Sequence, residues 1–168
     1  MLIDASYFTE WPRHIQNAQG PQMNINAQET KDAIMAYIRM FQWPFLKGVL
    51  GDRIGMDVTA YLKSIEKCLF DKKDAVMDQL IQRLKEPFAN YVFYKILRDS
   101  NSQATMTGLV RLKCANDYVA PIRRQVSAWN DMVDMVADFS SWCKSSDCTV
   151  PGIITDSNFL TKINVLNL

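Results

Sequence analysis

The chain has 168 residues, of which 48% are hydrophobic and 22% are charged, and its formal net charge is +1. This length predicts one domain whose core is large enough to be stable without disulfide bonds or a bound metal ion. A net charge so close to zero argues against a protein that grips free DNA, and also against a polybasic membrane anchor.

The first 25 residues predict an extended arm. Met1–Tyr7 is a short apolar lead, and residues 9–25 hold two prolines, a glycine and several amides, which are typical of a loop. The start also lacks the basic residues of a signal peptide, and no apolar run in the chain approaches the roughly 18 residues that a membrane span needs.

A helix is predicted to begin at Asn26, which is followed three residues later by Glu29 as in a capping box. Pro44 predicts a kink or a break in this helix, and Gly51 predicts its end. Its apolar positions follow helical spacing: Ile34, Tyr37, Ile38, Phe41, Phe45, Leu46 and Val49.

Three further helical segments are expected before residue 100. The first spans residues 54–69, and the second starts after a polar turn at residues 71–74 and continues to Leu84. Pro87 predicts the start of another helix, because proline is tolerated in a first helical turn. Residues 88–97 are apolar almost all round, which predicts a helix in the middle of a bundle.

Residues 99–108 predict a loop, and residues 109–113 a short strand. Pro121 opens a long helix whose expected buried stripe is Ile122, Val126, Trp129, Val133, Val136, Phe139 and Cys143. The fold class we expect is therefore mainly α: a bundle of about five helices over residues 26–148. An extended arm (1–25) precedes it, and an extended tail (149–168) with one or two possible short strands follows it.

Three aspartates, Asp131, Asp134 and Asp138, share one face of the long helix because they are three and four residues apart. A carboxylate metal site in a bundle needs facing glutamates and Glu-x-x-His pairs. The sequence has one histidine, His14, and no such pair, so we expect this face to be solvated or to form an interface, with no metal bound.

Arg123 and Arg124 lie in the first turn of the same helix, where the helix dipole disfavours cations. Either they are two exposed arginines whose unfavourable position costs little free energy, or an acidic surface of another molecule compensates their charge. In the second case the stripe of Asp131, Asp134 and Asp138 on a neighbouring copy would be the partner, in a head-to-tail contact.

Trp11, Pro12 and Arg13 form the candidate docking part of the arm. Trp11 stands in a polar loop with no helical partner, and an aromatic residue in an irregular arm is a reasonable anchor for another protein. Packing of Trp11 back onto its own domain is the alternative.

The sequence carries no motif for catalysis or for a cofactor. Cys68, Cys114, Cys143 and Cys148 form no CxxC pair, and neither a dinucleotide-binding nor a phosphate-binding glycine motif occurs. We therefore expect reduced thiols, no catalytic, metal-binding or cofactor-binding residue, and no enzymatic activity.

Three stretches in this order resemble a known family: LIDASYF with PRHIQNA, then FANYVFYKILRDSNSQATMTGLVRLK, and most strongly RRQVSAWNDMVDM. They are similar to the head–tail connector proteins, also called adaptor or head-completion proteins, of tailed bacteriophages, in the form found in Bacteroidales and crAss-like phages. The resemblance spans most of residues 1–143.

The resemblance implies a helical-bundle subunit that joins identical copies in a ring, typically a dodecamer, beneath the portal protein. The ring would be part of the virion neck, made in the host cytoplasm, and would dock the next tail or neck protein. DNA would pass through its lumen without sequence-specific binding. The alternative is a small non-enzymatic binding or regulatory domain of a phage or a bacterium.

Overall fold

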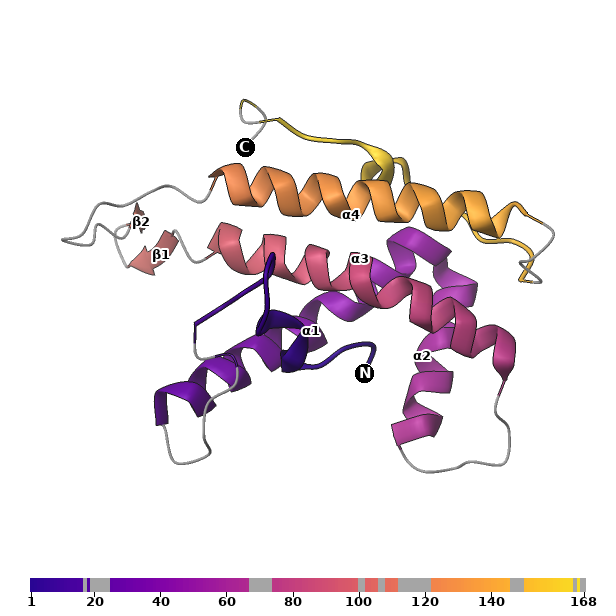
Figure 1. Cartoon of the computed structure of the whole chain (residues 1–168), viewed down its shortest axis with the longest axis horizontal. Helices are drawn as coiled ribbons and strands as arrows, with labels where there is room; N and C mark the ends of the chain where they lie inside the picture. Colours follow the sequence, from indigo (N-terminus) through magenta and orange to yellow (C-terminus); the bar gives the residue numbers. More distant parts are fainter. Residues whose placement is uncertain are drawn as a thin grey trace.

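The computed structural model, shown in Figure 1, describes residues 1–16, 18, 25–66, 74–99, 102–105, 108–111, 122–145, 150–164 and 166. Four α-helices make up most of this part: α1 (Ile25–Leu50), α2 (Asp52–Glu66), α3 (Ala75–Asp99) and α4 (Ile122–Cys143). The protein is mainly α, as the sequence predicts.

The corner between α1 and α2 is made by Gly51. Its φ of 81° is left-handed, a conformation that favours glycine, and its N–H donates to the carbonyl of Lys47 at 2.9 Å. The predicted stop at Gly51 is therefore confirmed. Pro44 does not split α1, because the fully buried side chains of Phe45 and Leu46 hold the following turn in the core.

The prediction that Pro87 separates two helices is wrong, and this accounts for four described helices where about five were expected. Pro87 lies inside α3, which runs without interruption from Ala75 to Asp99. A proline in a helix interior costs about 3 kcal/mol. Burial of Phe88, Val92 and Phe93 contributes about 1.5–3 kcal/mol each, so packing outweighs that cost. Of the apolar run expected to be buried, residues 88–93 are buried and residues 94–97 are half-buried.

α4 packs antiparallel along α3, and the two helices form the largest helix–helix contact of the fold (Figure 1). The buried face of α4 is rotated from the predicted stripe. Gln125, Ala128 and Met132 are buried, whereas Val126 and Trp129 are half-buried. Gln125 faces inward because its Nε2 donates to the carbonyl of Leu97 at the end of α3, at 2.8 Å.

The minor elements are a hairpin and two 3-10 helices. β1 (Ser102–Thr105) and β2 (Gly108–Arg111) pair antiparallel between α3 and α4, with Ser102 opposite Arg111. β2 falls in the region where a short strand was expected. The described part of the tail holds the 3-10 helix η2 (Ser157–Leu160) and no strand, which differs from the strands expected there.

Both ends of the chain contribute to the core. The first residues, expected to be extended, contain the 3-10 helix η1 (Ala5–Phe8), capped by the carboxylate of Asp4, and Leu2, Ile3 and Phe8 are buried. The tail runs along α4 (Figure 1) and inserts Phe159 among the rings of Phe45 and Tyr91. The division of the chain into an arm, a helical bundle and a tail stays a prediction.

Candidate functional site

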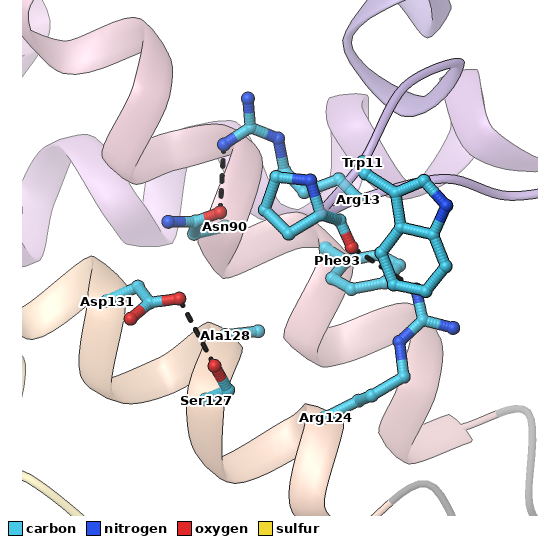
Figure 2. Close-up of a pocket in the computed structure, with 9 residues that line it drawn as sticks. Trp11, Arg13, Asn90, Phe93, Arg124, Ser127, Ala128 and Asp131 are labelled. Carbon is cyan, nitrogen blue, oxygen red and sulfur yellow. Dashed lines mark hydrogen bonds between the residues drawn. The ribbon is translucent and has the colours of Figure 1, made fainter.

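A small hollow lies where the N-terminal loop crosses α3 and α4, and we call it the Trp11 pocket (Figure 2). Its volume is about 130 Å³, about that of one medium-sized side chain. Its walls come from three parts of the chain: Trp11, Pro12 and Arg13 from the loop, Asn90 and Phe93 from α3, and Arg124, Ser127, Ala128 and Asp131 from α4. The structure thus brings together five of the predicted residues: Trp11, Pro12, Arg13, Arg124 and Asp131.

Arg124 ties α4 to the loop. Its guanidinium lies over the rings of Trp11, at 5.0 Å, and of Phe93, at 5.1 Å, and it donates to the carbonyl of Pro12 at 3.2 Å. Cation–π contacts of this kind contribute about 0.5–1 kcal/mol at exposed sites. The sequence points to Trp11 and to Arg124 for separate reasons, and the structure places them in contact. The charge of Arg124 thus meets a carbonyl and two rings of its own chain.

Arg13 fixes the loop to α3. Its side chain is only 13% exposed and pairs with Glu86 at 2.5 Å. It also donates to Asn90 Oδ1 at 2.9 Å and to the carbonyl of Tyr7 at 3.4 Å. The guanidinium therefore joins loop and helix through several hydrogen bonds, and Arg13 acts by holding Trp11 and Pro12 in position.

Trp11 remains 77% exposed although it touches Arg124. A second, more open hollow of about 390 Å³ is lined by residues of the N-terminal segment and of α3 that include Tyr7, Glu10 and Glu86. Trp11 and Arg13 line both hollows. The exposed indole therefore borders two concave surfaces, an arrangement suited to anchoring a partner.

The chemistry of the Trp11 pocket suits binding. Phe93 and Ala128 are buried apolar residues, and Asp131 is an exposed carboxylate that accepts from Ser127 Oγ at 3.3 Å. Figure 2 shows Asp131 and Arg124 at different positions along α4, on the side that faces the loop. An apolar side chain inserted here would meet charged groups at the edge of the pocket.

The other predicted residues lie outside the Trp11 pocket. Asp134 pairs with Lys162 of the tail at 2.7 Å. Arg123 and Asp138 are exposed on α4. All three aspartates are exposed on α4, but Asp131 borders the Trp11 pocket and accepts a hydrogen bond from Ser127 of the same helix, whereas Asp134 pairs with the tail.

Two side chains of α4, Trp129 and Asn130, form a clamp that holds the tail on α4 and that no sequence pattern predicts. Trp129 Nε1 donates to the carbonyl of Thr161 at 2.9 Å. Asn130 binds both backbone groups of Ile163: its Nδ2 donates to the carbonyl at 3.0 Å, and its Oδ1 accepts from the N–H at 2.9 Å. The partners lie some 30 residues apart, so no local pattern could have revealed this clamp.

Lys95 was also missed. Its ammonium nitrogen lies over the rings of Phe41, Tyr91 and Tyr94, at 5.3, 5.0 and 5.6 Å. Burial lowers the pKa of Lys95 below its usual value; Arg98 adds to this effect and Asp99 opposes it. The three rings stabilise the cation, so this lysine is stacked in the protein and does not line the Trp11 pocket.

Within the part of the chain that the structure describes, no cluster of three or more His, Cys, Asp and Glu residues could hold a metal ion. No helix in that part combines the length and apolar character needed to cross a membrane. Comparison with known proteins found no matching protein family, no matching curated protein and no matching solved structure.

Proposed function

We propose that this chain is a structural virion protein, the subunit of a connector ring that joins the capsid portal to the tail and extends the DNA channel. Support comes first from the three stretches that resemble phage connectors. A mainly helical fold with four described helices is compatible with the subunit that this resemblance implies.

The observation that carries the proposal is the position of the strongest stretch, RRQVSAWNDMVDM, on α4. This helix is braced by α3 on one side and leaves Arg123, Asp131 and Asp138 exposed. Arg123 and Asp138 are fifteen residues apart, which is about 22 Å along a helix. One rigid element therefore presents opposite charges at its two ends.

Opposite charges at separate places on one subunit suit a head-to-tail contact, in which each copy meets its neighbour through a different surface. Arg124 already contacts a carbonyl and two rings of its own chain. The ion pair of Asp134 with Lys162 is more than half exposed on both sides and contributes little. We therefore assign the contact to Arg123 on one copy and to the stripe of Asp131, Asp134 and Asp138 on the next. The exposed Trp11, held by Pro12 and Arg13, is the proposed anchor for the portal or the downstream neck protein.

A near-neutral subunit also suits a channel through which DNA slides, because neutralising many phosphates would hold the DNA in place. The ring would be a dodecamer in the virion neck, assembled from subunits made in the host cytoplasm. No chemical step and no cofactor is needed for this role.

The test is electron microscopy of the protein mixed with its portal, where we expect symmetric rings stacked on the portal. Arg123→Glu should abolish the rings, and adding Asp138→Lys to that variant should restore them. Lys63→Glu, an exposed reversal on α2, is the matched control and should leave the rings intact. Absence of rings with wild-type protein and portal would reject the proposal.

The alternative, a small non-enzymatic binding domain, is favoured by the Trp11 pocket, whose size fits a single side chain. It predicts a protein whose mass does not change when the portal is added. Sedimentation of the mixture separates the two functions, because a connector changes its mass when it meets the portal.

A further inference from the structure

α1 carries a second stripe, on the side away from the core. Six exposed residues follow one another at spacings of four, three, four, three and four: Glu29, Ala33, Ala36, Met40, Trp43 and Lys47. Met40 is 65% exposed and Trp43 is 38% exposed. The opposite side of the helix is buried through Ile34, Ile38 and Phe45. This alternation of threes and fours is the spacing of helices that pack against another helix along their length.

We propose that this stripe binds a second copy of the chain, with the two α1 helices antiparallel and related by a two-fold axis that crosses the stripe at the level of position 38. The pairs follow from the numbering, because positions that sum to 76 face each other in this register. Glu29 meets Lys47 of the other copy, Ala33 meets Trp43, and Ala36 meets Met40, and each pair occurs twice.

The sizes of the side chains are complementary in this register. The N-terminal half of the stripe offers Ala33 and Ala36, which are small, and the C-terminal half offers Met40 and Trp43, which are large. An antiparallel arrangement sets each large side chain against a small one, as interdigitated packing requires. A parallel arrangement would set large against large. Trp43 is braced from behind, because its ring lies against Gly55 of α2, where an added Cβ would come within 3.4 Å.

The charges are complementary as well. The dipole of α1 favours Glu29 near the start of the stripe and Lys47 near its end. The dipole does not explain why Met40 and Trp43, which lie between them, are exposed. Lys47 pairs with Asp52 at 3.0 Å, and both side chains are more than half exposed. Such a surface pair contributes little, so Lys47 is available to Glu29 of another copy.

The surface of α1 leaves space for a second helix, and the length of the stripe sets the size of the contact. From Glu29 to Lys47 the stripe is about 27 Å long, and Figure 1 shows the N-terminal half of α1 lying apart from α2 and α4. A contact between two single helices is at the small end of specific interfaces, below about 1,200 Å², so we expect a weak and reversible dimer. This dimer uses α1 and not the charges of α4, so it stands or falls independently of the proposed ring.

The first experiment is sedimentation equilibrium of the full chain without any portal. The wild type should show a concentration-dependent monomer–dimer equilibrium, and Met40→Glu should weaken it by roughly a hundredfold because two charges enter the contact. Met56→Glu is the matched control, since Met56 is 57% exposed on α2 and outside the stripe. A wild type that stays monomeric at several hundred micromolar would overturn the proposal, as would equal weakening by the control.

The second experiment tests the register. Glu29→Lys alone and Lys47→Glu alone should each weaken the dimer by roughly tenfold, because two attractive pairs become two repulsive ones. An equimolar mixture of these two variants should regain wild-type affinity, since all pairs in the mixed dimer are again Glu with Lys. A mixture no tighter than its components would overturn the antiparallel register.

Discussion

Gly48 is the residue whose lack of a side chain matters most to the packing of the tail. A Cβ at this position would lie 2.2 Å from Cε2 of Phe159, inside any allowed contact. The backbone comes close there too, because the N–H of Asp156 donates to the carbonyl of Gly48 at 2.7 Å. A side chain at position 48 would therefore force Phe159 to shift and would loosen the docking of the tail on α1.

Gly48→Ala should destabilise the protein by about 1–3 kcal/mol, the usual cost of overpacking. The cost arises from the clash with Phe159, so in the background of Phe159→Ala the same change should cost almost nothing. Urea unfolding of the four proteins in a double-mutant cycle measures this coupling. Equal costs in both backgrounds would show that the tail does not pack on Gly48.

Lys95 should titrate below its usual range. Burial removes water from the ammonium and lowers its pKa. Between the folded pKa and the usual value of 10.5, the unfolded chain binds more protons, so the contribution of Lys95 to stability rises with pH in that window. Carbon-detected NMR of the lysine Cε should place the Lys95 midpoint lower in the folded protein than in urea.

Lys95→Met provides the control for this prediction. Burial raises the pKa of Tyr37 and Tyr91, and these groups lower stability as the pH rises towards and above 10. The difference in unfolding free energy between wild type and Lys95→Met should report the contribution of Lys95 alone. As the pH rises from 8 to 10.5, the wild type should become more stable relative to Lys95→Met. A constant difference would contradict the lowered pKa.

At the scale of the element, the sequence predicts what is local and misses what depends on packing. The end of α1 at Gly51 follows from a left-handed glycine, and α1 begins at Ile25, one residue before the expected cap at Asn26. The merging of two expected helices at Pro87 could not be predicted, because it depends on burial against other elements. The rotation of α4 has the same origin: Gln125 is drawn inward by a carbonyl of α3.

Pro44 leads to a prediction for α1. It lies exposed in the interior of the helix, where it removes a backbone donor without contributing a buried ring. Pro44→Ala should therefore raise the unfolding free energy by about 1–3 kcal/mol. Pro87→Ala is the comparison, because Pro87 is buried and its loss also removes packing. Urea unfolding measures both, and a Pro44→Ala protein no more stable than wild type would contradict the argument.

The Trp11 pocket joins residues that lie far apart in the sequence, so the sequence predicts some of its residues but not that they meet. Trp11 stood out as an aromatic residue in a polar loop, and Arg124 as a cation in the first turn of a helix. Their contact joins residues more than 110 positions apart, and no local pattern encodes such a distance. Asn90 and Phe93, which complete the pocket, looked like ordinary positions of an apolar helix.

The attachment of the tail to α4 should depend on the clamp formed by Trp129 and Asn130. Asn130→Ala removes both hydrogen bonds to Ile163, worth about 1–2 kcal/mol together. The tail should then detach more often, and trypsin should cleave after Lys162 roughly tenfold faster. Asn158→Ala, an exposed change in η2, is the control. Equal cleavage rates in wild type and Asn130→Ala would show that the clamp does not hold the tail.

The insertion of Phe159 has a consequence for how the protein is made. Its ring meets Phe45, Tyr91 and Trp129, which are synthesised much earlier. A nascent chain that already contains all four helices still lacks the residue that fills this space, so the aromatic groups around it stay partly open to solvent while translation continues. During that interval the emerging polypeptide should bind holdase chaperones.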